Sequence, residues 1–186
     1  KQGNFNLGPM WDQDGVHDIY RRWRKVLDGY DGDRVLVAEA WVPEPERLAR
    51  YVRADEMHQA FNFDFLSSAW DAASYRRVIT ETMAANAAVG APTTWVLSNH
   101  DVVRHATRLA REDTSDTEGI AATDPQPDAA LGLRRGRAAT LMMLALPGSA
   151  YLYQGEELGL PEHTAVPDDL RQDPIWFRSE RDQVGR

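Results

Sequence analysis

Apolar and polar positions along the chain switch repeatedly between helical and strand spacing. From Asp14 to Leu27 apolar residues recur every three or four positions, which predicts a helix with one buried face. Asp12 or Asp14 is available as its N-cap, and Gly29 as its stop. The next run, RVLVAEA at 34–40, has polar residues only at its ends, which is typical of a strand covered on both faces.

The following segments continue this alternation of helix and strand. A short helix is expected within 43–53, where Pro and Glu fill the first turn. The pattern then predicts a strand at 58–65, a helix at 71–88, a strand at 93–101, a loop at 113–128, a helix at 129–146 closed by Pro147 and Gly148, and a strand at 149–154.

This order of elements predicts an α/β fold made of right-handed βα units with a parallel sheet. Four strands do not close a barrel, and a complete (β/α)8 barrel takes about 250 residues. We therefore expect residues 1–186 to be a partial (β/α)8 barrel, roughly its last four βα units. A doubly wound open sheet is the alternative, although the chain has neither GxGxxG nor GxxxxGK.

Composition narrows the classes of partner. An apolar content of 42% with six tryptophans indicates a folded protein. A net charge of −8 without a basic stripe disfavours nucleic acid and anionic membranes as partners. The absence of cysteine excludes disulfides and thiolate zinc sites and favours the cytoplasm. No apolar run approaches the roughly 20 residues of a spanning helix.

Carboxylates follow three of the predicted strands. Glu39 comes after VLVA, Asp101 after WVLSNH, and the pair Glu156 and Glu157 after YLYQG. In parallel α/β folds the reactive residues gather at these strand ends, so Glu39 and Asp101 are expected to face one ligand from two sides. Two carboxylates across a sugar are what glycoside hydrolysis requires. Glu156 and Glu157 are expected to be structural, supporting the barrel end or opening a helix.

Three segments carry a resemblance to a known family. VLVAEAW, VLSNHDVVRH and YLYQGEELGL resemble strand segments of the α-amylase family of glycoside hydrolases (family 13), especially its α-glucosidase and oligo-1,6-glucosidase branch. The segments VHDIYRRWRKVLDGY and DPIWFRSERDQVGR are similar to the same branch, so the resemblance covers essentially the whole chain. It implies a (β/α)8 catalytic domain, of which this chain would be the C-terminal half.

The resemblance also implies roles for particular residues. Glu39 would be the general acid/base, and Asp101 would stabilise the transition state by binding hydroxyls of the glucose. His100 would donate a hydrogen bond to the same sugar, and Asn99 would set the turn that aims both side chains. Arg104 would line the neighbouring subsite.

Two further implications of the resemblance concern the ends of the chain. Arg186 would belong to an Arg-Asp-Gly type segment that holds the non-reducing glucose. The family's nucleophile segment, Asp-x-x-x-Arg-x-Asp, is not found before Glu39. In a retaining enzyme the nucleophile lies about 5 Å from the acid, so we expect it in a missing N-terminal half. The start, which has no initiator Met and no signal sequence, also indicates a fragment.

The predicted function is therefore retaining hydrolysis of α-glucosidic bonds in short oligosaccharides such as maltose or isomaltose, with no cofactor and no metal. The chain alone is expected to be inactive and, with its strand edges exposed, to self-associate. Transglycosylation or isomerisation of disaccharides is the nearest alternative. Two others stay open: a non-catalytic interaction module, and a metal phosphohydrolase that uses His100 and Asp101 as ligands.

Overall fold

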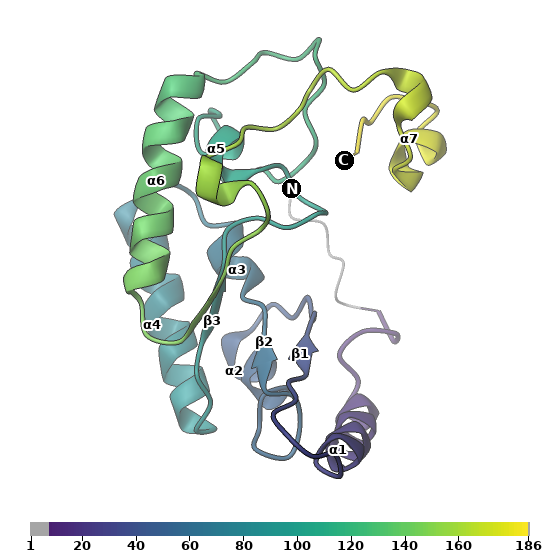
Figure 1. Ribbon diagram of the computed structural model, residues 1–186, viewed down its shortest axis with the longest axis vertical. Helices are drawn as coiled ribbons and strands as arrows, with labels where there is room; N and C mark the ends of the chain where they lie inside the picture. The colour runs from purple at the N-terminus through teal and green to yellow at the C-terminus, as the bar shows by residue number, and fades with distance from the viewer. Residues whose placement is uncertain (1–7, 186) are drawn as a thin grey trace. The chain divides into compact units, whose positions relative to one another are not determined.

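The computed structural model describes residues 8–185 and divides into two compact units (Figure 1). The first unit runs to Asp64 and includes Arg76–Trp95 and Pro147–Ser149. The second comprises Phe65–Tyr75, Val96–Leu146 and the chain from Ala150 onward. The first four elements, all in the first unit, are α1 (Gly15–Leu27), β1 (Val37–Ala38), α2 (Pro45–Arg50) and β2 (Gln59–Ala60).

The core of the first unit forms around a parallel strand pair. Val37 of β1 lies opposite Gln59 of β2, and Ala38 lies opposite Ala60, which confirms the predicted parallel pairing. Buried residues of both strands and of the segment after α2 pack together here, with partly buried residues of α1 against them: Ala38, Tyr51, Val52, Met57, Ala60, Val16 and Tyr20. The strand predicted at 34–40 is shorter, since only two of its residues belong to β1.

The helix predicted from Asp14 to Leu27 is confirmed as α1, and one of its two predicted N-cap residues, Asp14, is confirmed as well. Asp14 occupies the N-cap position and makes no side-chain capping hydrogen bond. Its carboxylate instead accepts a hydrogen bond from Arg50 at 2.7 Å. Asp14 has helical backbone angles, φ −56° and ψ −32°, rather than the extended ones of a typical capping residue, and its carboxylate binds an arginine of α2 instead. At the other end, Gly29 N donates to Val26 O, as expected for the stop.

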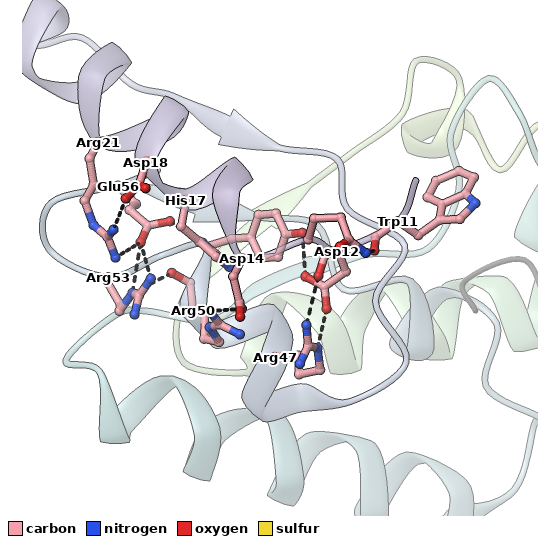
Figure 2. Close-up of polar contacts among 12 residues, drawn as sticks. Trp11, Asp12, Asp14, His17, Asp18, Arg21, Arg47, Arg50, Arg53 and Glu56 are labelled. Carbon is pink, nitrogen blue, oxygen red and sulfur yellow. Dashed lines mark hydrogen bonds and ion pairs between the residues drawn. The ribbon is translucent and has the colours of Figure 1, made fainter. Parts of the chain in front are cut away.

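A buried ion pair anchors α1 to the turn after α2 (Figure 2). His17 Nδ1 lies 2.6 Å from Glu56 Oε2, and both side chains are almost completely buried. The second oxygen of Glu56 is bound by Arg21 and Arg53. A buried carboxylate is tolerated only when it is paired and hydrogen-bonded, so this set of contacts is what permits Glu56 to be at 0% exposure.

The strand predicted at 58–65 is only partly correct. β2 ends at Ala60, and Phe63–Leu66 forms the short helix α3. The alternating aromatic residues that indicated a strand have separate tertiary contacts: the Phe63 ring stacks on Trp41, and the Phe65 ring packs edge-on against Tyr75. Tertiary packing therefore overrides the local period here, as it does for many short segments of β-type pattern.

The remaining elements follow the predicted order closely. They are α4 (Ala72–Ala88), β3 (Thr94–Val96), α5 (His105–Arg108), α6 (Ala129–Ala145), β4 (Ser149–Tyr151), η1 (Glu156–Leu158), η2 (Asp168–Leu170) and α7 (Pro174–Arg178). The helices predicted at 71–88 and 129–146 and the loop at 113–128 are confirmed. The helix α5 was not predicted, because four residues are too few to show a helical period.

Strands β3 and β4 form a second two-stranded sheet, and a glycine makes their approach possible. Gly148 has φ +115°, and a Cβ there would lie 2.3 Å from Thr93 O. Ser149 N donates to the same carbonyl at 2.9 Å. The predicted end of the preceding helix at Pro147 and Gly148 is therefore confirmed, and Gly148 also starts the strand pairing.

The described strands form two separate pairs rather than one four-stranded sheet. The order of helices and strands and the parallel β1–β2 pair agree with an α/β fold. The assignment of these elements to one half of a barrel stays a prediction. Within residues 8–185, no helix has the length and apolar character needed to cross a membrane.

His58 gives the first unit a pH-dependent stability that can be measured. Leu36 N donates to His58 Nδ1 at 3.1 Å, so this nitrogen must be unprotonated in the folded chain. Burial, and secondarily Arg24, holds the pKa of His58 below its ordinary 6.5. The unfolded chain therefore binds a proton more readily, and the free energy of unfolding should fall as the pH drops through about 6.5 toward the folded pKa.

We expect His58→Gln to remove this component, because the Gln side-chain oxygen can still accept from Leu36 N but does not titrate. Melting temperatures of the two proteins between about pH 7.5 and 5 check the prediction. Parallel curves for the variant and the wild type would contradict it.

Candidate functional site

Glu39 lies directly after β1, at the carboxyl end of the parallel pair. The preceding residue, Ala38, is buried in the core of the first unit, whereas Glu39 is exposed. A partly buried strand thus delivers a carboxylate to solvent at the edge where parallel α/β folds place reactive groups. Its predicted role as general acid/base stays a prediction.

An aromatic stack follows Glu39. Trp41 lies face to face with Phe63, with ring centroids 3.9 Å apart and ring planes 8° apart. Phe63 is buried, whereas Trp41 retains 39% exposure. One face of the indole is therefore supported by packing while part of the ring remains accessible to a ligand. The sequence analysis did not identify Phe63, because it was assigned to a strand that the structure replaces with α3.

The aspartates that precede Glu39 in WDQDGVHD are bound to arginines (Figure 2). Asp12 binds Arg47 and also accepts from the Tyr51 hydroxyl. Arg50 binds Asp14 and lowers the pKa of its carboxyl. Asp18 binds Arg21 within α1. Asp12 and Asp14 therefore tie the start of α1 to α2, and all three carboxylates are paired, which accords with the expectation that the nucleophile lies elsewhere.

The segment NHD forms a tight turn after β3, in the second unit. Asn99 Oδ1 accepts hydrogen bonds from Asp101 N at 2.9 Å and from Val102 N at 3.1 Å. This Asx turn is what a short amide side chain provides at such a position. The side chains of His100 and Asp101 are 72% and 54% exposed, with 3.5 Å between His100 Nε2 and Asp101 Oδ1. Asn99 therefore presents both side chains to solvent, where a sugar could contact them.

Arg104 closes the same loop from the other side. Its backbone N–H donates to Glu162 Oε2, and its Nη1 donates to Gln154 O at 2.8 Å. The guanidinium also lies 4.9 Å from the ring centroid of Tyr153. Arg104 is thus tied to the segment after β4, beside the exposed turn that carries Asp101. The other predicted sugar-binding arginine, Arg186, lies outside the described residues.

Buried side chains at both ends of this loop contact one another and hold it in place. Ser98 Oγ accepts from His105 N, and His105 Nδ1 lies 3.1 Å from Glu156 Oε1. Glu156 begins η1, so the expectation that it opens a helix is confirmed. The sequence analysis missed the role of His105, because its partners come from distant segments and no local pattern indicates them.

A buried arginine fixes the long loop that follows α5. Arg108 is fully buried and donates to Leu97 O at 3.2 Å and to Thr114 O at 2.8 Å. Burial lowers the pKa of Arg108 to about 10, which leaves it protonated at neutral pH. Its two terminal nitrogens thus bind carbonyls of the segment after β3 and of the loop 113–128, so the loop is held against the rest of the second unit.

Within residues 8–185, no group of three or more His, Asp or Glu side chains is placed to hold a metal ion. The histidines outside NHD have other contacts where the structure gives them: His17 with Glu56, His58 with Leu36 and His105 with Ser98. The phosphohydrolase alternative for His100 and Asp101 therefore lacks a third ligand among the described residues.

Comparison with known proteins gives one family and several relatives. Residues 8–186 match the family described as "Alpha amylase, catalytic domain". A probable alpha-glucosidase of Rhizobium meliloti is 35% identical over 175 residues, covering 91% of this chain and 28% of that protein. A trehalose synthase of a Pimelobacter species is 30% identical over 178 residues, covering 82% of this chain and 31% of that protein.

A solved structure resembles the fold as well. The crystal structure of the alpha-glucosyl transfer enzyme XgtA superposes with a TM-score of 0.72 at 28% identity, covering 94% of this chain and 29% of that one. The chain therefore spans less than a third of the length of these relatives.

Proposed function

Because the chain belongs to the alpha-amylase catalytic-domain family, we propose that it supplies two of the reactive carboxylates of an enzyme that hydrolyses α-glucosidic bonds in short oligosaccharides with retention. Glu39 protonates the glycosidic oxygen and then activates water, and Asp101 binds sugar hydroxyls in the oxocarbenium-like transition state. The observation that carries the proposal is that both carboxylates are exposed beyond the ends of strands β1 and β3, inside segments typical of this family.

The chain contributes the last four βα units of the barrel in this proposal. Its coverage of 28–31% of the relatives' length supports a part rather than a whole catalytic domain. The nucleophile lies in the preceding part of the full-length protein, since the aspartates before Glu39 in WDQDGVHD are bound by arginines. The chain alone therefore binds a sugar incompletely and does not hydrolyse it.

Transfer to a second sugar is the second candidate function. This candidate is supported by two of the similar proteins, a trehalose synthase at 30% identity and an alpha-glucosyl transfer enzyme at 28%. Whether such an enzyme hydrolyses its substrate or transfers the glucose depends on whether water or a sugar reaches the glycosyl-enzyme intermediate. The retained pair Glu39 and Asp101 argues against a third candidate, a non-catalytic module.

Glucose release from maltose and isomaltose tests the proposal. The purified chain is assayed alone and after mixing with a separately produced segment that precedes it in the full-length protein. We expect no release by the chain alone and release on mixing, with Glu39→Gln chain in the same mixture as the inactive control. Chromatography of the products separates free glucose from transfer products. Release by the chain alone would show that the nucleophile lies within it and overturn this assignment.

A further inference from the structure

We propose that the buried pair of His105 and Glu156 is a positioning device for the loop 99–104, which presents His100 and Asp101. The proposal rests on the proposed function, because it concerns how the sugar-binding loop is held. Neither residue needs to touch substrate, since both are buried. They are positioning residues that act through the turn in front of them.

Hydrogen bonds between Ser98 and His105 join the two ends of the loop at its base. Ser98 Oγ, immediately before Asn99, accepts from His105 N at 2.9 Å and lies 3.0 Å from His105 Nδ1. The exposed side chains of His100 and Asp101 lie between these two anchor residues in the sequence. Any movement of His105 therefore changes the span that the turn must bridge.

His105 is in turn held by two other elements of the second unit. Its Nε2 lies 3.2 Å from Thr140 Oγ1 on α6, and its Nδ1 lies 3.1 Å from Glu156 Oε1. Glu156 is itself fixed, because Oε2 accepts from Tyr153 N at 3.1 Å. One imidazole thus joins the end of β3, the helix α6 and the turn after β4.

The neighbours of His105 Nδ1 indicate whether this nitrogen carries a hydrogen. This nitrogen faces both Ser98 Oγ and Glu156 Oε1, but it can carry only one hydrogen. Glu156 Oε1 is buried and makes no well-directed hydrogen bond within the described residues. If Nδ1 only accepted from Ser98, that carboxylate oxygen would face a lone pair, which is costly in a buried site. We therefore place the hydrogen on Nδ1, within hydrogen-bond distance of Ser98 Oγ, so that no lone pair of the ring faces Glu156 Oε1.

A role in positioning fits this pair better than a role in stability. A buried ionised group adds little net stability compared with apolar packing, and in some proteins such groups instead fix a unique geometry. Small misplacements of groups that act on a transition state have large effects, on the order of 100-fold in rate for 1 Å. The pair thus protects the alignment of Asp101 more than it protects folding.

The test uses the full-length protein and the variant Glu156→Gln, which keeps the size of the side chain and removes its charge. We expect kcat for maltose to fall about tenfold or more while KM changes far less, because alignment in the transition state is lost. Glu156→Asp keeps the charge and should recover part of kcat. Hydrogen exchange of the peptide amides across 98–105 should become faster in Glu156→Gln.

Asp128→Ala is the matched control for a purely structural effect. The Asp128 side chain caps α6 in the same unit by accepting from Leu131 N, and it does not contact the loop 99–104 through any described hydrogen bond. This variant should lower the melting temperature without changing kcat or the exchange of 98–105. If Glu156→Gln does not fold, Thr140→Val takes its place, since it removes the contact to His105 Nε2.

The outcomes separate the two proposals. Unchanged kcat and unchanged exchange in the Glu156→Gln protein would overturn the positioning role. So would a loss of kcat and a gain in exchange in Asp128→Ala as large as those in Glu156→Gln. A wild-type protein that is inactive on α-glucosides would overturn the proposed function instead. The exchange measurement would still test the positioning of the loop in that case.

Discussion

The full-length protein with Glu39→Gln is expected to hydrolyse maltose about 10²- to 10⁴-fold more slowly than the wild type. The amide keeps the size and exposure of the side chain after β1 but has no proton to give to the leaving oxygen. Expulsion of a sugar alkoxide without protonation is slow, so the loss should fall on the first chemical step. Initial rates with maltose, measured on both proteins at the same enzyme concentration, give the factor.

The choice of substrate identifies the step that Glu39 serves. With α-glucosyl fluoride the leaving group departs without a proton, so Glu39→Gln should form the glycosyl-enzyme intermediate at nearly the wild-type rate. Hydrolysis of the intermediate still needs a base and should become slow. A burst of fluoride followed by a slow phase is therefore expected, and added azide, a nucleophile that needs no base, should accelerate the slow phase.

Glu44→Gln is the matched control for this experiment. Glu44 is exposed, lies in the same connection between β1 and α2, and makes no side-chain capping hydrogen bond. Its substitution changes the net charge by the same amount and should leave both substrates unaffected. Equal losses in the two variants would assign the effect to charge near the site. Wild-type rates in Glu39→Gln would remove Glu39 from the mechanism.

Local sequence patterns predicted those parts of the fold whose secondary structure is determined by local interactions. The regular spacing of apolar residues identified α1, and the helices α4 and α6 were found with nearly correct ends. The parts that were predicted incorrectly are determined by side-chain contacts between segments distant in sequence. The Asp14 side chain binds an arginine of α2 rather than a backbone N–H of α1, and Phe63 stacks on Trp41 rather than continuing a strand. Such contacts depend on tertiary packing, which no local window contains.

In the candidate site, too, local patterns identified some residues and missed those held by contacts between distant segments. Glu39 and the NHD turn were identified from residues that adjoin strands, and the Asx turn of Asn99 follows from its own side chain. His105 was not identified, because its contacts with Thr140 and Glu156 join segments that are distant in sequence. That Glu39 and Asp101 bind one sugar stays a prediction. The role of Asp101 can be tested directly by substitution.

Asp101→Asn in the full-length protein is expected to lower kcat/KM for maltose by about 10²- to 10³-fold, the usual loss when one preorganised electrostatic group is removed from a transition state. The turn itself should survive, because Asn99 bonds the backbone N–H of residue 101 and not its carboxylate. The carboxylate lies 3.5 Å from His100 Nε2, a long contact between two exposed side chains. The melting temperature should therefore stay unchanged, which distinguishes lost chemistry from lost structure.

The control is Asp169→Asn, an exposed aspartate of η2 whose substitution removes the same charge from the same unit. We expect it to keep wild-type kcat/KM. Because Asp101 acts on the sugar ring and not on the leaving group, its variant should lose activity on maltose and on α-glucosyl fluoride alike, unlike Glu39→Gln. Recovery of Asp101→Asn on the fluoride would show that the residue assists departure of the leaving group and would overturn the division of roles between the two carboxylates.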